Sequence, residues 1–332
     1  MNGKMHQVLL DREPQGSPVT DDFRLREAEL PEPADGQVLC ETLFLSLDPY
    51  MRSQIAGRHL SGTIAPGDVM RGETVSRVLQ SKHSDVAVGT LVRCFGGWQT
   101  HSVHSASEVH PLPPEFPAPS LALSTLGMPG LTAWAGLHCL AQPRAGETVV
   151  IPAATGGVGA VAGQLAKAKG CRVIGIAGSD EKCRQATETL GYDLCLNRKS
   201  GDLDAALSEA CPEGIDVFFD LVGGEILTLC SSKLAVGARV LLCGLMADYN
   251  SKERPAGPPP GFWIRSRATV YGLVVYDYEH RRDEFLGQAI DLYNQGKLKA
   301  WEDTSDGIDS APDAFARLMR GENRGKAVVK VA

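Results

Sequence analysis

The residues with the clearest chemical pattern lie in one glycine-rich turn, Ala154-Thr155-Gly156-Gly157-Val158-Gly159. Their spacing is A-x-G-x-x-G, a dinucleotide-binding spacing in which Ala154 replaces the first glycine. In such a turn Gly156 lets the backbone approach a pyrophosphate, Gly159 permits close packing of helix against strand, and the helix N-terminus faces the anion. The turn follows a β-branched run and opens a helix-length segment, which is the context that the motif requires. The pattern predicts nucleotide binding, and a purely structural glycine turn is the alternative.

The type of nucleotide is indicated by the residues about 20 positions further along the chain. Sites that prefer NAD carry Asp or Glu at the end of the second strand, but this chain has Ala177-Gly178-Ser179 there and no carboxylate before Asp180. Lys182, and Arg198 after the next strand, supply cations that suit the 2′-phosphate of NADP. The alternative roles are a helix N-cap for Ser179 and solvated surface charges for the two cations. We therefore expect NADPH as the cofactor.

The elements that must position this turn alternate between β-branched runs and helix-length segments from Thr148 onward. The expected strands are 148–151, 172–176, 194–197, 216–220, 239–243 and 269–275. The expected helices are 157–169, 180–190, 203–211, 225–234 and 283–295. Six strands with alternating helices predict a doubly wound parallel sheet of the Rossmann type, and therefore the α/β fold class.

The first 124 residues are short apolar runs broken by Pro, Gly and Asp, which is typical of a mostly β domain. In the tail, 311–320 is expected to form a helix and 327–331 a strand that returns to this domain. The predicted organisation is a β domain of residues 1–124 completed by 301–332, with a nucleotide-binding domain of residues 125–300 inserted between. The proline-rich segment Arg254–Gly261 can be neither helix nor central strand, so it is either a connector or a loop over a ligand cleft.

Composition excludes several classes of protein. The chain has 332 residues, 43% hydrophobic and 22% charged, which fits about two globular domains. A net charge of −7 argues against a nucleic-acid footprint, which is usually basic. Nine cysteines without a C-x-x-C pair fit reduced thiols, and no apolar run is long enough to span a membrane. We expect a cytoplasmic protein.

Several motifs, in this order, resemble one known family. They are Leu47-Asp48-Pro49-Tyr50-Met51-Arg52, Leu126-Gly127-Met128-Pro129-Gly130-Leu131-Thr132-Ala133, the glycine turn, Ala177-Gly178-Ser179-Asp180-Glu181-Lys182, Asp220-Leu221-Val222-Gly223-Gly224 and Gly257-Pro258-Pro259-Pro260. The chain resembles a zinc-free medium-chain dehydrogenase/reductase of the branch that holds prostaglandin reductases, 2-alkenal double-bond reductases and curcumin reductases. The resemblance implies a GroES-like β domain and a Rossmann domain. It also implies NADPH-dependent reduction of the C=C bond of α,β-unsaturated ketones or aldehydes, and a homodimer.

The resemblance also implies roles for individual residues. Lys182 is expected at the 2′-phosphate, Asn323 near the nicotinamide, and Tyr50 and Tyr249 in the substrate pocket. The remaining expected cofactor contacts are Thr155, Gly156, Gly157, Val158, Gly178, Ser179, Arg198, Cys243, Gly244 and Tyr249. Arg198 replaces a tyrosine of many relatives, which strengthens a phosphate contact because a guanidinium can bind phosphate bidentately. Leu221 replaces an asparagine of some relatives, which implies one lost cofactor contact.

Zinc chemistry is not expected. The place where zinc-dependent relatives have Gly-His-Glu is Arg71-Gly72-Glu73-Thr74, without the histidine, and no cysteines have metal-ligand spacing. His101, His104 and His110 would not share one face of a strand, so surface histidines are the favoured interpretation. A Ser-His-Asp hydrolase is also excluded, because no G-x-S-x-G motif occurs.

Without zinc, hydrogen-bond donors must stabilise the enolate oxygen that forms when hydride reaches the β-carbon of an enone. We expect Tyr249, Tyr50 and the cofactor ribose 2′-hydroxyl to share that role. Tyr276 and Met128 are further pocket candidates, and Trp98, Phe262 and Trp263 are either pocket walls or core residues. The alternative functions are quinone reduction of the zeta-crystallin type and non-catalytic NADPH binding. The strand expected at 269–275 would pair two copies into a homodimer.

Overall fold

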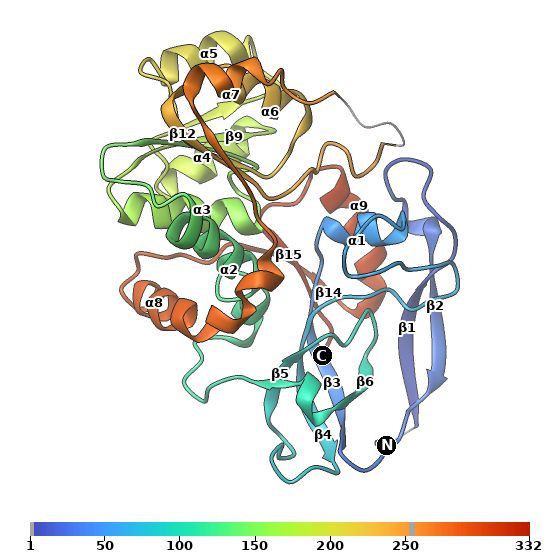
Figure 1. The fold of residues 1–332 in the computed structure, drawn as a ribbon. Helices are drawn as coiled ribbons and strands as arrows, with labels where there is room; N and C mark the ends of the chain where they lie inside the picture. Colours follow the sequence, from blue (N-terminus) through green and yellow to red (C-terminus); the bar gives the residue numbers. More distant parts are fainter. Residues whose placement is uncertain (1–2, 252–255) are drawn as a thin grey trace. The chain divides into compact units, whose positions relative to one another are not determined.

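The computed structural model describes residues 3–251 and 256–332 and divides the chain into two compact units. One unit comprises residues 1–123 and 302–332, and the other comprises residues 124–301 (Figure 1). We call them the β unit and the nucleotide unit, after the elements that they contain.

The nucleotide unit is built on a parallel sheet with the strand order β10-β9-β8-β11-β12-β13. Its strands are β8 (Thr148–Pro152), β9 (Arg172–Ala177), β10 (Leu194–Asn197), β11 (Ile215–Asp220), β12 (Leu234–Leu242) and β13 (Thr269–Gly272). In sequence order this is 3-2-1-4-5-6, the order of a doubly wound dinucleotide-binding sheet. The Rossmann prediction is therefore confirmed. Because these strands are parallel, the carboxyl ends of β8, β9 and β10 lie together on one side of the sheet. The glycine turn, Ser179 and Arg198 follow these three strand ends.

Helices cover both faces of this sheet (Figure 1). They are α2 (Met128–Trp134), α3 (Gly157–Ala168), α4 (Asp180–Glu188), α5 (Leu203–Ala210), α6 (Gly224–Ser231), α7 (Gly261–Ser266) and α8 (Arg282–Asn294). Residues of α5, α6 and α7 pack on Phe218 and Val240. On the opposite face, the π-helical turn η4 (Ala135–Leu140) that follows α2 lies against Phe219, because a Cβ on Gly136 would come 2.6 Å from the Phe219 ring. Phe218 and Phe219, neighbours in β11, therefore pack against the helical layers on opposite faces of the sheet.

Three boundaries differ from the sequence predictions by three residues or more. Strand β12 begins at Leu234 rather than 239, because Leu234 already pairs with Ile215, and helix α6 accordingly ends at Ser231. Strand β13 ends at Gly272 rather than 275, because its partner β12 ends at the paired residue Leu242. Within the proline-rich segment, residues 254 and 255 lie outside the described residues. Pro260 is the N-cap of α7, which begins at Gly261. That short helix was not predicted.

The β unit contains a sheet with the strand path β14-β15-β3-β4-β5-β7, from which β6 branches by pairing with β3. Its strands are β3 (Gln37–Ser46), β4 (Thr74–Ser81), β5 (Leu91–Cys94), β6 (His101–Ser105), β7 (His110–Pro111), β14 (Glu302–Asp306) and β15 (Lys326–Lys330). A separate hairpin pairs β1 (Lys4–Leu10) with β2 (Phe23–Glu29), and the helices are α1 (Tyr50–Ile55) and α9 (Ala311–Met319). Strand β15 lies between β14 and β3, so residues 326–330 form an interior strand of this sheet.

The core of the β unit holds Trp98, which is fully buried. Its ring stacks on Phe23 at a centroid distance of 5.5 Å and meets Phe315 edge to face at 5.5 Å. Trp98 is thus a packing residue, which settles one of the alternatives left open by the sequence. No helix among residues 3–251 and 256–332 combines the length and apolar character needed to cross a bilayer.

Candidate functional site

The glycine turn joins β8 to α3 in a conformation that suits an anion. Ala153 has φ +51°, a left-handed value that strains a residue with a side chain, and its carbonyl accepts a hydrogen bond from the Gly156 amide at 2.8 Å. Gly156 is extended and is the N-cap of α3. The N–H groups of the first helical turn, from Gly157 onward, have no intrahelical acceptor, and the helix dipole adds partial positive charge there. This geometry can bind a phosphate.

Gly159 allows helix and turn to approach closely. A Cβ built on Gly159 would come 2.3 Å from the Ala153 carbonyl oxygen and 3.1 Å from the Ala154 Cα. Both distances are far below van der Waals contact, so no larger residue fits without moving the turn. A Cβ on Gly156 would meet the same carbonyl at 3.2 Å, a milder restriction. The close packing that the motif implies is therefore present at Gly159.

A second group of predicted residues gathers where β9 and β10 end. Asn197 pairs with Ala177, and the Arg198 amide donates to the Ala177 carbonyl at 2.9 Å. The Arg198 guanidinium lies beside Gly178, with Nε 3.8 Å from the position of a Cβ on that glycine. Ser179 caps α4, its hydroxyl accepting from the Lys182 amide at 3.3 Å. The fold thus brings together Gly178, Ser179, Arg198 and the first turn of α4, which carries Lys182.

The carboxylate of Asp180, at the start of α4, belongs to the same region. It accepts a hydrogen bond from the Asn197 Nδ2 at 2.7 Å, and this bond joins β10 to α4. Asp180 lies one residue beyond Ser179, and Asn197 is held by its pairing with Ala177 of β9. Asp180 therefore ties α4 to β10 instead of standing at the end of β9, where NAD-preferring sites place their acid.

The loop after β11 is organised by a buried carboxylate. Asp220 is fully buried and accepts hydrogen bonds from the Val222 and Gly223 amides at 3.0 Å each. Burial raises the pKa of Asp220 to about 6, although these two amides act in the opposite direction. Its main-chain carbonyl accepts from the amides of Cys243 and Gly244 at 3.0 and 3.3 Å. Asp220 therefore fixes the segment that holds these two predicted cofactor contacts.

Gly244 and Tyr249 complete this loop. A Cβ on Gly244 would come 2.9 Å from the Leu221 carbonyl oxygen, so the residue must be small. The Tyr249 hydroxyl accepts a hydrogen bond from the Leu245 amide at 3.4 Å. Burial raises the pKa of Tyr249 and also raises the pKa of the Cys243 thiol, to about 12. Both groups therefore keep their protons at neutral pH, and Tyr249 is a hydrogen-bond donor there.

In the β unit, Tyr50 is the first residue of α1, and the residues around it in the motif are structural. Asp48 forms a buried ion pair with Lys326 at 3.0 Å and accepts from the Ser46 hydroxyl. Arg52 is buried and donates to main-chain carbonyls of an earlier loop. Tyr50 itself is half-buried and stacks on the His59 ring at a centroid distance of 4.8 Å. Of this motif, Tyr50 offers the chemically useful side chain.

Asn323 lies in the turn that leads into β15. Its Nδ2 donates to the Gly325 carbonyl at 2.6 Å, so the amide is fixed by its own turn. The adjacent Lys326 Nζ donates to the Leu47 carbonyl at 2.6 Å in addition to its pairing with Asp48. The same buried ammonium thus anchors both the segment of Asn323 and the segment of Tyr50.

The remaining pocket candidates are less enclosed within their own unit. Met128 begins α2, is half-buried, and its carbonyl accepts from the Thr132 hydroxyl at 2.8 Å. Tyr276 is 43% exposed in the 3₁₀ turn η5 (Val275–Arg281) that follows β13. Phe262 and Trp263 are half-buried on α7, where Trp263 packs against the core of the nucleotide unit. Trp263 is thus a core-facing residue, and the role of Met128 and Tyr276 stays a prediction.

The residues that the sequence analysis weighed for a zinc site have other contacts here. Glu73 forms a buried ion pair with Arg93. His104 is half-buried, with its Nε2 2.8 Å from the Ser102 hydroxyl. Within residues 3–251 and 256–332, no three His, Cys, Asp or Glu side chains are grouped so that they could hold a metal ion.

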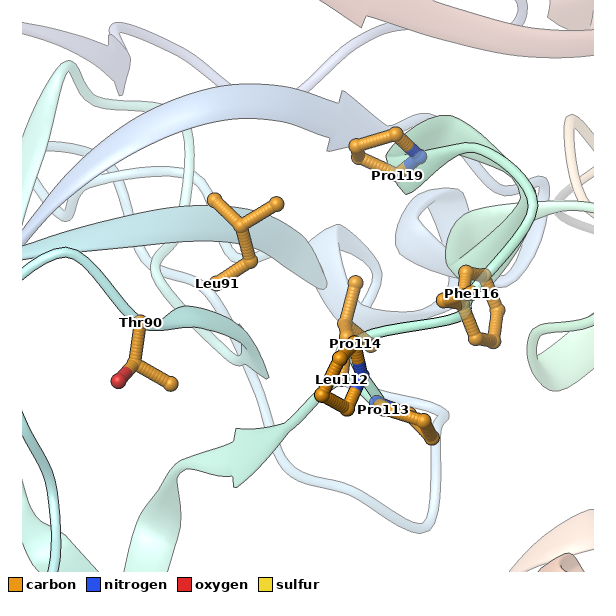
Figure 2. Close-up of a pocket in the computed structure, with 7 residues that line it drawn as sticks. All are labelled: Thr90, Leu91, Leu112, Pro113, Pro114, Phe116 and Pro119. Carbon is orange, nitrogen blue, oxygen red and sulfur yellow. The ribbon is translucent and has the colours of Figure 1, made fainter.

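The β unit also has an apolar groove of about 290 Å³ (Figure 2). Its lining residues are Thr90, Leu91, Leu112, Pro113, Pro114, Phe116 and Pro119. The lining carries no ionisable side chain and includes none of the site residues predicted from the sequence. This groove therefore has no group that could assist hydride or proton transfer.

Comparisons with known proteins identify the family. A model described as the N-terminal domain of oxidoreductase matches residues 6–112, and one described as zinc-binding dehydrogenase matches residues 157–295. The NADPH-dependent curcumin reductase of Escherichia coli (strain K12) is 42% identical over 98% of this chain and 96% of its own length. The chain belongs to the medium-chain dehydrogenase/reductase superfamily.

Within that superfamily the chain lies in the branch of curcumin, prostaglandin and 2-alkenal reductases, as the motifs predicted. Prostaglandin reductase 1 of Bos taurus is 40% identical over 95% of each chain. The crystal structure of CurA from Vibrio vulnificus in complex with NADPH has a TM-score of 0.94 and 39% identity, covering 98% of this chain and 99% of that chain. The predicted α/β class with a mostly β N-terminal domain is confirmed as well.

Sequence reasoning missed two buried residues of this medium-chain reductase, one in each unit. Lys326 was not singled out, because a lysine ordinarily indicates an exposed position and its burial depends on pairing with a distant aspartate. Tyr192 was also missed. The signal that could have found it is the pair Gly163 and Gly175, glycines inside a helix and a strand, which indicate close approach of another group.

Proposed function

We propose that this protein catalyses NADPH-dependent reduction of the C=C bond of α,β-unsaturated ketones and aldehydes. The observation that carries the proposal is the grouping at one edge of the sheet. There the anion-binding turn after β8 stands beside Ser179, Lys182 and Arg198, in a chain of the curcumin and prostaglandin reductase branch. A pyrophosphate site next to a phosphate-binding cation is what NADPH requires and NADH does not.

The residues present fit this cofactor. Gly156 and Gly159 leave the turn without side chains at these positions, and the α3 N-terminus offers amide donors that would face the pyrophosphate. Thr155, Gly157 and Val158 would also lie along it. Arg198 and Lys182 would hold the 2′-phosphate, the former bidentately. When bound, NADPH would supply the hydride that is transferred to the β-carbon of the enone.

The chain's own chemical task is to stabilise the negative charge that develops on the substrate oxygen. A protonated hydroxyl is required, and Tyr249 provides one at neutral pH, since burial raises its pKa further above the ordinary value. Tyr249 is the leading donor, and Tyr50, held at the start of α1, is the second. Asn323 would orient the nicotinamide amide from its fixed turn. A preorganised donor of this kind typically contributes about 10²-fold or more to the rate.

The deciding experiment is a steady-state screen of NADPH and NADH oxidation over small alkenals, aryl enones and quinones. We expect saturated carbonyl products and a strong preference for NADPH. Semiquinone formation with quinones and no turnover of enones would instead establish the quinone reductase alternative. Binding of NADPH without oxidation across the whole panel would establish a non-catalytic protein.

The role of Tyr249 has its own test. Tyr249→Phe retains the ring and removes the donor, so we expect kcat/KM with a reactive enone to fall by about 10²-fold. An unchanged kcat/KM would remove Tyr249 from the mechanism. Tyr293→Phe, on α8, makes the same chemical change outside the proposed site and the proposed dimer edge, and serves as the control.

We further propose that the protein is a homodimer of the cytoplasm. Strand β13 is one of the two edge strands of the nucleotide unit's sheet, and a second copy can pair its own β13 with it. All nine cysteines are free thiols, which fits a reducing compartment. Light scattering of the purified protein at the monomer mass of 35.5 kDa would refute the dimer.

A further inference from the structure

Tyr192 lies in the connection between α4 and β10, directly beneath the anion-binding turn. The side chain is only 3% exposed. Its hydroxyl donates to the Gly159 carbonyl at 2.7 Å and approaches the Ala154 carbonyl at 3.3 Å. These two residues are the first and last of the A-x-G-x-x-G motif. One buried hydroxyl therefore contacts both sides of the turn that would hold the pyrophosphate.

The protein makes room for this ring at two places. A Cβ on Gly163, inside α3, would come 2.2 Å from the Tyr192 ring. A Cβ on Gly175, inside β9, would come 2.8 Å from the Ala154 Cβ, 3.0 Å from the Cys195 Sγ and 3.1 Å from the Tyr192 ring. A glycine in the interior of a helix or strand costs about 0.5–1 kcal/mol relative to alanine. Gly163 therefore leaves space for the Tyr192 ring, and Gly175 leaves space for both the ring and Ala154 of the turn.

The hydroxyl has one proton, and the distances show where it goes. The shorter contact, to the Gly159 carbonyl, is a normal hydrogen bond, and the Ala154 carbonyl receives the weaker branch. Burial raises the pKa of Tyr192 well above its ordinary value. The hydroxyl is therefore a donor throughout the working pH range of a reductase.

We infer that Tyr192 is a positioning residue for the pyrophosphate-binding turn. It sets the distance between the Ala154 and Gly159 sides and so preorganises the amides of α3. This inference rests on the proposed NADPH site. It assigns no contact with the cofactor to Tyr192, because the side chain acts through the turn above it.

The test is Tyr192→Phe, which keeps the ring and removes the hydroxyl. The Gly159 carbonyl remains within α3, where the helix supplies an amide donor four residues on, so the variant is expected to fold. We expect the Kd of NADPH to rise roughly 3- to 10-fold, the factor that corresponds to one hydrogen bond. The Kd of adenosine 2′-monophosphate, which has the 2′-phosphate but no pyrophosphate, should stay the same.

The control is Tyr293→Phe on α8, the same chemical change elsewhere in the nucleotide unit. Hydrogen–deuterium exchange without any nucleotide provides the second readout. Exchange of the amides in 153–160 should accelerate in Tyr192→Phe and not in Tyr293→Phe. An unchanged Kd for NADPH, an equal loss for both nucleotides, or unchanged exchange in 153–160 would each overturn the inference. A wild-type protein that does not bind NADPH would overturn the proposed function, whereas the exchange measurement on the free protein still decides the positioning role.

Discussion

At the scale of single residues, the Ala153 carbonyl limits how closely helix α3 can approach the turn, because Gly159 packs against it. Gly159→Ala would place a methyl group 2.3 Å from the Ala153 carbonyl oxygen, so the turn must shift. Because the amides that face the pyrophosphate belong to the same turn, we expect the Kd of NADPH to rise by about tenfold or more, equivalent to ~1.4 kcal/mol. Fluorescence titration with NADPH measures it.

Gly287→Ala is the matched control for this change. Gly287 lies within α8, and a Cβ there would have no neighbour within 4 Å. The same substitution should stabilise the protein by about 0.5–1 kcal/mol, because alanine favours a helix, and leave nucleotide affinity unchanged. Equal effects of the two variants on affinity would show that Gly159 has no special steric role.

The buried carboxylate of Asp220 predicts a pH dependence of stability. Its pKa is raised from the ordinary 3.8 to about 6, so the folded protein binds this proton more tightly than the unfolded chain does. Stability from this group is therefore present below about pH 4 and is lost as the pH rises to about 6, by roughly 3 kcal/mol in all. Asp220→Asn cannot titrate, and this pH dependence should disappear in the variant.

Urea denaturation of both proteins between pH 4 and pH 7 tests this prediction. The difference in the free energy of unfolding, wild type minus variant, should fall with rising pH, because other titrating groups cancel between the two proteins. A difference that stays constant over this range would mean that Asp220 titrates as it does in the unfolded chain.

Residue-scale prediction from the sequence succeeded where backbone geometry is encoded locally. The glycine spacing marks the turn, and Gly159 has the close contact that the motif implies. Residues whose role depends on burial could not be found in this way. Tyr192 and Lys326 are chemically ordinary in the sequence, and only partners far along the chain make them buried and polar at once. The roles of Tyr249, Tyr50 and Asn323 remain predictions.

At the scale of elements, the ion pair of Asp48 with Lys326 joins the β3–α1 loop to β15. Both side chains are almost completely buried. Removing one partner leaves an uncompensated buried charge, so Lys326→Met should destabilise the protein by about 3–5 kcal/mol. Chemical denaturation measures the loss. Replacing both partners in Asp48→Asn/Lys326→Met should recover part of it, since the orphan charge is then gone.

The surface pair Lys4–Glu27, whose side chains are about half exposed, supplies the comparison. Lys4→Met should change the free energy of unfolding by less than about 1 kcal/mol, because solvent screens exposed ion pairs. A loss at Lys326 as small as that at Lys4 would show that the buried pair contributes no more than a surface pair.

Element boundaries were predictable only where the ends are set by local residues. Strand β10 and the start of α3 and α5 follow from turn and capping signals, and they begin where predicted. Strand β12 starts five residues early and β13 stops three residues early, because the pairing partner determines the length. Helix α7 was missed because proline disrupts the interior of a helix but is tolerated where a helix begins, and Pro260 is the N-cap of α7.

At the scale of the whole molecule, the cofactor should stabilise the folded protein through linkage. A ligand at 100 times its Kd adds about 2.7 kcal/mol to the free energy of unfolding. For a domain the size of the nucleotide unit this corresponds to a rise in Tm of roughly 5–10 °C. NADH at the same concentration should give a much smaller rise, because it cannot engage Arg198 and Lys182. Equal shifts in a thermal scan would mean that the 2′-phosphate is not recognised.

The insertion of one unit into the other has a consequence for how the chain is made. Val328 of β15 pairs with Ser46 of β3, and β15 lies between two other strands of its sheet. While the ribosome is still adding residues, the sheet of the first-synthesised unit lacks an interior strand, whereas residues 124–301 are a continuous segment that can fold as they emerge. The domain that begins the chain must therefore be the last to finish folding. During that interval the edge of β3 that awaits β15 is open to the wrong strand.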